Sequence, residues 1–96
     1  MDKTTKLDQE RELLVALGAN IARRRKKLGY SQLRLALAVG VSKSYLCDVE
    51  HGRRNVSVAL IARICRQLGV SMRDMCAGIG PKKLTIRKKR GSKATS

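Results

Sequence analysis

The stretch "VSKSYLCDVEHGRRN", residues 41–55, contains the features that decide how this chain folds. Ser42 precedes an apolar-periodic run, and its hydroxyl can accept a hydrogen bond from the first-turn amides of a helix. Gly52 supplies the left-handed residue on which helices often end, so a short helix is predicted over residues 43–51. At about 100° per residue its polar side chains share one face. These are Lys43, Ser44, Cys47, Asp48 and His51, with Tyr45, Leu46 and Val49 opposite.

A second short helix is predicted immediately before it, over residues 32–39. Only Gly40, Val41 and Ser42 separate the two. So short a link, with a glycine to reverse the chain, is typical of a helix-turn-helix arrangement. Ala36 is small enough for the close approach of two steeply crossing helices. The expected shared core positions are Leu35, Val39, Val41, Leu46 and Val49.

Further serines and glycines predict where the other helices begin and end. Ser31, Ser57 and Ser71 precede apolar-periodic runs, as N-caps do. The expected stops are Gly29, Gly40, Gly52, Gly69 and Gly78. This punctuation adds helices over residues 58–68 and 72–77.

The first helix is predicted to be longer than the others. Residues 5–8 fit a capping box, and acids early with bases late suit the helix dipole. The expected buried stripe is Leu14, Leu17, Ile21 and Leu28. Gly18 weakens the middle of this helix and allows a break there. The fold class predicted for residues 1–80 is therefore an all-α domain of five helices.

The charge of the chain points to a polyanionic partner. The 96 residues carry a formal charge of +15 with a pI near 10.8, which favours nucleic acid or an anionic membrane surface. Residues 81–96 hold seven cations and no acid, so they are predicted to be a mobile tail. The tail would either reach DNA as an electrostatic arm or keep the chain soluble. No predicted helix combines a bulky apolar face with a basic one, so a membrane surface is the weaker partner.

Several kinds of chemistry find little support in the sequence. There is no apolar run long enough for a membrane span or signal peptide, so a cytoplasmic protein is expected. Three irregularly spaced cysteines suggest reduced thiols. Cys47 and His51 are spaced as two metal ligands could be, but no further histidine exists. We therefore predict no metal and no cofactor, and an inert Cys47 is favoured over a redox switch. With no phosphate loop, paired carboxylates or nucleophile–base constellation, an enzyme is not expected.

Three segments together resemble the lambda-repressor-like helix-turn-helix DNA-binding proteins of Cro/C1 and XRE type. They are "LGANIARRRKKLGYSQ" (17–32), "LALAVGVSKSYLCDVEHGRRN" (35–55) and "LIARICRQLGVSMRDM" (60–75). The resemblance covers roughly residues 17–78. It implies a sequence-specific, usually dimeric transcriptional regulator that binds double-stranded DNA.

In such a motif the second helix enters the major groove with its polar face toward the bases. Lys43 could then donate to guanine O6 or N7, and Ser44 could contact either kind of base edge. Asp48 would be repelled by phosphates, so it either accepts from cytosine N4 or only orients a nearby cation. A solvated polar face is the plainer alternative for all three.

Other residues are expected to contact the DNA backbone. Arg53 and Arg54 follow the helix at once and should bind phosphate without sequence information. Tyr45 is expected mainly to pack, although its hydroxyl could reach a phosphate. The resemblance implies that Gln32 contacts phosphate and braces the recognition helix.

The resemblance also implies two structural contacts. Glu50 matches a structural acid that pairs with an arginine on the first helix, and Arg25 occupies the matching position. Relatives often dimerise near the last helix, where this chain has Met72, Met75 and Cys76.

One departure from the family pattern is apolar. Leu33 and Leu37 stand where relatives usually have polar residues, and something could cover them, either the N-terminal extension with Leu7 or another protein. This leaves two rival functions open. One is an adaptor or antitoxin-type module that binds a protein through these leucines. The other is sequence-neutral packaging of nucleic acid, driven by charge.

Overall fold

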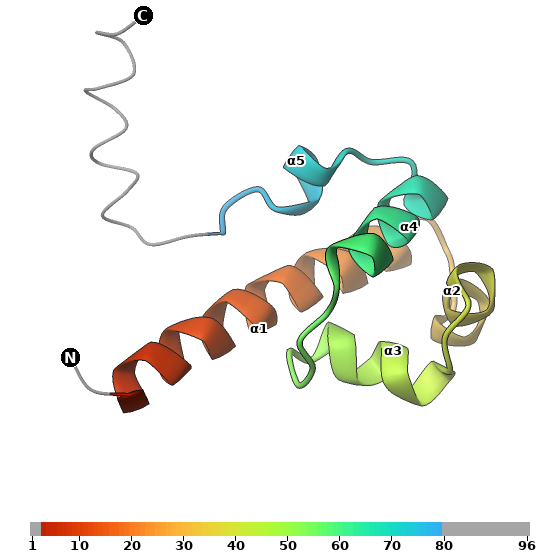
Figure 1. Cartoon of the computed structure of the whole chain (residues 1–96). Helices are drawn as coiled ribbons and strands as arrows, with labels where there is room; N and C mark the ends of the chain where they lie inside the picture. The colour runs from red at the N-terminus through yellow and green to blue at the C-terminus, as the bar shows by residue number, and fades with distance from the viewer. Residues whose placement is uncertain (1–2, 80–96) are drawn as a thin grey trace, which may run out of the picture.

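The computed structural model describes residues 3–79, with side chains from residue 7 onward. This part of the chain is all-helical, which confirms the predicted fold class (Figure 1). Its five helices are α1 (Lys3–Lys27), α2 (Gln32–Val39), α3 (Lys43–Glu50), α4 (Val58–Leu68) and α5 (Met72–Met75). The predicted basic tail, residues 81–96, lies outside the described residues.

The serine and glycine signals act as the sequence predicts. The hydroxyls of Ser31, Ser42, Ser57 and Ser71 each accept a hydrogen bond from the backbone N–H three residues later. Gly40 and Gly69 end α2 and α4 in the left-handed conformation. Helix α3 ends at Glu50 with His51 as its C-cap, one residue earlier than predicted.

Helix α5 is two residues shorter than predicted, ending at Met75 and not at Ala77. The buried side chain of Asn20 on α1 donates from Nδ2 to the carbonyl oxygens of Met75 and Ala77, at 2.7 and 3.3 Å. Residues 76–78 form a turn after Met75. The last helix is therefore tied to α1 by one amide.

Helix α1 departs from the predictions in three ways. It begins at Lys3, so Thr5 lies inside it and is not its N-cap. It runs unbroken through Gly18, and the missing side chain there lets α3 approach closely. A Cβ at position 18 would lie 2.4 Å from the carbonyl oxygen of Val49. Leu28 follows the end of the helix and is 54% exposed, and the buried Arg25 occupies the last inward position of the stripe.

The core of the described part of the chain contains no aromatic residue among its buried side chains and is built from all five helices, with α5 contributing Met75. Helix α3 contacts both α1 and α2, while α5 packs on α1 and α4. The fully buried side chains of largest volume are Ile21, Leu35, Leu46, Ile64 and Met75. The N-terminal part of α1 extends beyond this core (Figure 1). Its side chains from Leu7 to Leu13 are exposed. The arrangement leaves one side of α3 facing outward.

Candidate nucleic-acid interface

The outward face of α3 carries the polar side chains that the helical periodicity predicts. Leu46 and Val49 are buried toward the core. On the other side the side chains are exposed or half-buried: Lys43, Ser44, Cys47, Asp48 and His51. The sequence pattern and the fold therefore agree on which face of the helix is free.

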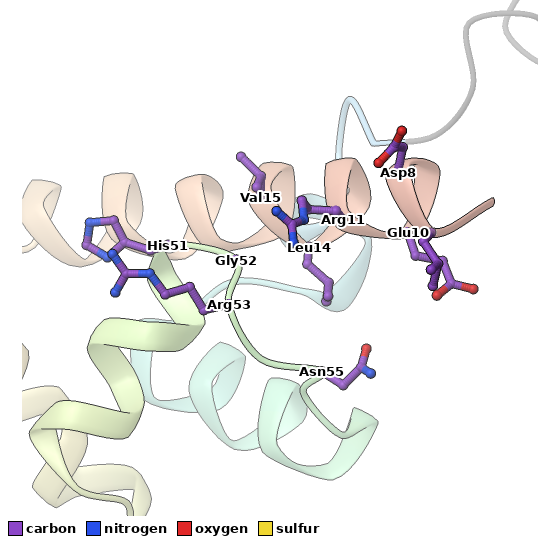
Figure 2. A pocket seen from close by; sticks show the side chains of 10 residues that line it. Asp8, Glu10, Arg11, Leu14, Val15, His51, Gly52, Arg53 and Asn55 are labelled. Carbon is purple, nitrogen blue, oxygen red and sulfur yellow. The ribbon is translucent and has the colours of Figure 1, made fainter. Parts of the chain in front are cut away.

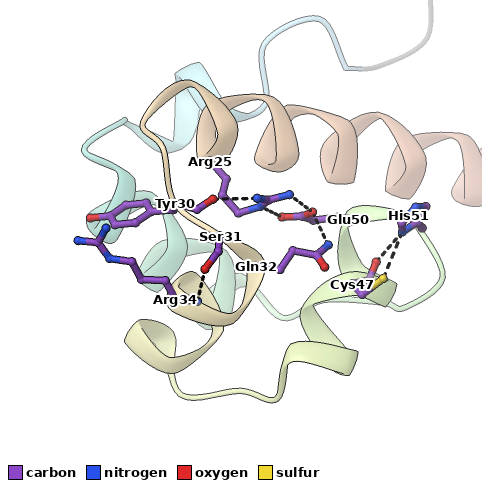
Figure 3. Close-up of polar contacts among 8 residues, drawn as sticks. All are labelled: Arg25, Tyr30, Ser31, Gln32, Arg34, Cys47, Glu50 and His51. Carbon is purple, nitrogen blue, oxygen red and sulfur yellow. Dashed lines mark hydrogen bonds and ion pairs between the residues drawn. The ribbon is translucent and has the colours of Figure 1, made fainter.

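A buried polar cluster fixes the inner side of α3 (Figure 3). The guanidinium of Arg25 donates from Nε and Nη2 to the two carboxylate oxygens of Glu50, at 2.7 and 3.0 Å. Arg25 also donates to the carbonyl oxygen of Tyr30 at 2.8 Å, and Gln32 Nε2 donates to Glu50 at 2.9 Å. The pair implied by the resemblance is thus present, with side chains only 9% and 3% exposed. It connects the end of α3 to α1 and to the start of α2.

A second, more exposed cluster lies at the exit of α3. The carboxylate of Asp48 lies 3.3 Å from Nη1 of Arg53 and 3.6 Å from Nε of Arg54. The guanidinium of Arg54 also lies over the ring of Tyr45, 5.0 Å from its centroid. Tyr45 itself is half-buried and packs against the core. Of the two roles open to Asp48, these contacts favour orienting cations.

Cys47 and His51 are neighbours on the outward face (Figure 3). Nδ1 of His51 lies 2.8 Å from the carbonyl oxygen of Cys47 and 3.7 Å from its sulfur. Because a carbonyl oxygen only accepts, the contact at 2.8 Å is a hydrogen bond in the tautomer that carries its ring proton on Nδ1. In the described part of the chain, no group of three or more potential metal ligands gathers anywhere.

An open groove separates the N-terminal part of α1 from the loop that follows α3 (Figure 2). Its lining mixes acids of α1 with basic residues of the loop, including Asp8, Glu10, His51 and Arg53. At its floor Gly52 packs directly on α1, since a Cβ at this position would lie 2.7 Å from Cα of Val15. The loop that carries Arg53 and Arg54 is therefore supported by the first helix.

The structure corrects two expectations about surfaces. Met75 is completely buried in the core, so it is unable to form a dimer contact, whereas Met72 and Cys76 are exposed. Leu33 and Leu37 are 51% and 72% exposed. Leu7 does not cover them, because it lies near the free end of α1, beside the loop after α3.

Sequence reasoning missed four side-chain contacts that connect the helices and the segments between them. Asn20 ties α5 to α1, and Arg23 donates to the Asn20 side-chain oxygen. Arg63 of α4 donates to the carbonyl oxygen of Val39 at 3.2 Å, at the end of α2. Arg34 lies over the ring of Tyr30, 4.5 Å from its centroid. Only Asn20 had a visible signal, as a polar residue beside the apolar stripe of α1.

No helix among the described residues is long and apolar enough to cross a membrane.

Comparison with known proteins identifies the family to which the chain belongs. A helix-turn-helix family model, HTH_3, matches residues 21–75. The chain is 38% identical over 55 residues to the uncharacterized HTH-type transcriptional regulator y4dJ of Sinorhizobium fredii, covering 57% of this chain and 71% of that protein.

Two solved structures are similar in fold. The clp gene regulator ClgR from C. glutamicum has a TM-score of 0.65 and 41% identity, with 67% of this chain and 82% of that chain covered. The restriction-modification controller protein C.AhdI from Aeromonas hydrophila has a TM-score of 0.63 and 35% identity, with 65% and 94% covered. The chain therefore belongs to the XRE/Cro/C1-type helix-turn-helix family and is a DNA-binding transcriptional regulator.

Proposed function

We propose that α3 enters the major groove of double-stranded DNA with its outward face toward the base edges. The observation that carries this proposal is the two-sided construction of α3. Its inner side is held by a buried ion pair, and its outer side presents exposed polar groups beside two arginines. A short helix held rigidly in this way suits insertion into a groove that is about as wide as a helix.

Lys43 and Ser44 are the base contacts in this proposal. Both are exposed at the N-terminal end of α3, the end from which recognition helices usually contact bases. The ammonium of Lys43 donates to guanine O6 or N7, and the hydroxyl of Ser44 can donate or accept. Asp48 was predicted as a third base contact, but both of its oxygens already face arginines.

Gln32, Tyr45, Arg53 and Arg54 contact the phosphate backbone. The Gln32 amide has two N–H donors, and only one is needed for its bond to Glu50. Arg53 and Arg54 are largely exposed at the exit of α3. These contacts set the position and orientation of the domain on the duplex without sequence information.

The active species is a homodimer on a two-fold symmetric site. Its two α3 helices would lie about 34–36 Å apart, one turn of DNA or a multiple of it. Met72 and Cys76 are exposed on and just after α5 and provide a candidate contact between protomers. Such a regulator binds without catalysis and acts in the cytoplasm, on the nucleoid.

The test is selection of the full chain on a random duplex library at physiological salt, followed by sequencing. Enrichment of a two-fold symmetric motif supports a dimeric, sequence-specific regulator. Binding that persists without any motif and falls steeply with salt would instead indicate charge-driven packaging, and the proposal would be wrong.

The exposure of Leu33 and Leu37 favours a second candidate, a protein-interaction module of adaptor or antitoxin type. The double variant Leu33→Ser, Leu37→Ser tests this function. Both residues belong to α2, so the variant leaves the proposed DNA-binding face of α3 unchanged. A stoichiometric partner that co-purifies with the wild-type chain and is lost from the variant supports this function. If the variant loses only DNA binding, this surface has no separate partner.

A further inference from the structure

A cluster of four side chains closes the C-terminal end of the α3 face: Tyr45, Asp48, Arg53 and Arg54. The Asp48 carboxylate uses its oxygens separately, with Oδ1 at 3.3 Å from Arg53 and Oδ2 at 3.6 Å from Arg54. Arg54 lies between this carboxylate and the Tyr45 ring. Asp48 therefore contacts both of the arginines that follow the helix, and the Tyr45 ring contacts Arg54 as well.

The backbone produces this arrangement. Gly52 has a φ of 72°, which turns the chain back at the end of α3. The N–H of Arg53 then donates to the carbonyl oxygen of Asp48 at 2.9 Å. Tyr45 and Asp48 are three residues apart, so they are neighbours on the helix surface and can both reach Arg54. The close packing of Gly52 on Val15 of α1 keeps this turn in place.

The cluster leaves the arginines available to a second anion. Asp48 has a side chain 31% exposed, while Arg53 and Arg54 are 62% and 53% exposed. A guanidinium has five N–H donors, and each contact with Asp48 involves only one nitrogen. Both arginines can therefore bind phosphate while they remain in contact with the carboxylate.

The charge of Asp48 also has an effect of its own. A carboxylate on a DNA-facing surface opposes the release of counterions that drives binding to any duplex. Two arginines kept in one orientation meet phosphates well only when α3 has the correct register in the groove. Two unrestrained arginines would follow the phosphates of any sequence.

We infer that Asp48 is a specificity-determining positioning residue, which orients Arg53 and Arg54 for the phosphates of the cognate site and weakens binding to unrelated DNA. This inference rests on the proposed function, since it requires α3 in the groove. It differs from a direct contact with cytosine N4, which would determine the base at one position of the site.

The experiment measures dissociation constants of Asp48→Asn for the selected duplex and for a random duplex at the same salt. Loss of one opposing charge should tighten binding to both duplexes by a similar factor, on the order of fivefold. Loss of the ion pairs should in addition weaken binding to the selected duplex alone, by about two- to fivefold. Because the effect of the charge is common to both duplexes, the ratio of the two affinities falls by about two- to fivefold, with the enriched motif unchanged. Glu12→Gln removes an equal charge from an exposed position on α1, outside the α3 face and the proposed dimer contact, and should leave this ratio near the wild-type value.

A double-mutant cycle separates positioning from base contact. If Asp48 acts through the arginines, Asp48→Asn should change the ratio much less in a chain that already carries Arg53→Ala and Arg54→Ala. The inference is overturned if the effect of Asp48→Asn is unchanged in that background, or if the variant alters the preferred base at one position. A wild-type chain that enriches no motif would overturn the proposed function itself, which is a different result.

Discussion

Helix α3 carries two acids, Glu50 and Asp48, that stand two residues apart and form opposite kinds of ion pair. Glu50 faces inward with a side chain 3% exposed, and Arg25 holds it with two hydrogen bonds. Asp48 faces outward with a side chain 31% exposed, and its contacts with Arg53 and Arg54 are longer. One carboxylate of α3 thus stabilises the fold, and the other lies on the face that is proposed to contact DNA.

The difference follows from solvent. A buried carboxylate that loses its partner keeps the cost of desolvation, so each partner is strongly required. An exposed ion pair is screened by water and salt, and it contributes little to stability. The inner face of α3 should therefore respond to substitution through folding, and the outer face through binding.

The largest expected effect comes from breaking the inner pair. Glu50→Ala leaves Arg25 buried without its carboxylate and should lower the free energy of unfolding by about 3–5 kcal/mol. Asp48→Ala is the matched control and should lower it by at most about 1 kcal/mol. Urea denaturation of both variants measures the difference. Equal losses would contradict the assignment of the two acids to different roles.

On the outer face, Lys43→Ala and Arg53→Ala should separate base contact from phosphate contact. Lys43→Ala should cost about 1–3 kcal/mol of discrimination at one base position, because it removes a donor to guanine. Arg53→Ala should weaken binding to the motif and to its single-base variants alike, and reduce the salt dependence by about one phosphate contact. Binding titrations against single-base variants at several salt concentrations measure both effects. Identical profiles for the two variants would show that Lys43 contacts only phosphate.

Gly18→Ala tests how closely the inner side of α3 packs against α1. The new Cβ would lie 2.4 and 2.5 Å from the carbonyl oxygens of Val49 and Glu50, which belong to backbone and yield little. Overpacking of about 1–3 kcal/mol is expected, reduced by the ~1 kcal/mol that alanine gains over glycine in a helix. Thermal denaturation should therefore show a lower Tm. A higher Tm would mean that α3 is not held as closely to α1 as the structure indicates.

The smallest expected effect concerns a thiol of the core. Burial, with a smaller contribution from nearby Cys76, raises the pKa of Cys65 above its ordinary value of 9.0. The unfolded chain therefore loses this proton first as the pH rises, so stability is full below about pH 9 and declines above it. Cys65→Ala should show a smaller loss of unfolding free energy between pH 8 and pH 10 than the wild-type chain. Equal losses in the two proteins would show that Cys65 does not contribute.

Most of the helix boundaries could be predicted from the sequence because local signals set them. A serine hydroxyl caps its own helix, and a left-handed glycine ends one, without help from the rest of the fold. The exceptions depend on contacts between distant segments. Asn20 of α1 binds the carbonyls that follow α5, and Gly18 meets α3, so neither the early end of α5 nor the unbroken α1 is visible locally.

In the candidate site, too, features set by local sequence could be predicted, and features that depend on distant contacts could not. Periodicity alone identified the outward face of α3, because helix geometry places those side chains together. The role of Asp48 stayed open, since Arg53 and Arg54 reach it only after the turn at Gly52 folds the chain back. The resemblance implied a dimer contact at Met75, whereas the side chain is buried by the packing of α5 against α1 and α4, which no local signal shows.

The most direct test of the central claim is methylation interference on the enriched duplex. Methylation of guanine N7 projects into the major groove, and methylation of adenine N3 projects into the minor groove. If the outward face of α3 occupies the major groove, N7 methylation within the motif should abolish binding, and Lys43→Ala should remove the interference at one guanine of each half-site. Interference by adenine N3 methylation alone would place recognition in the minor groove and contradict this account.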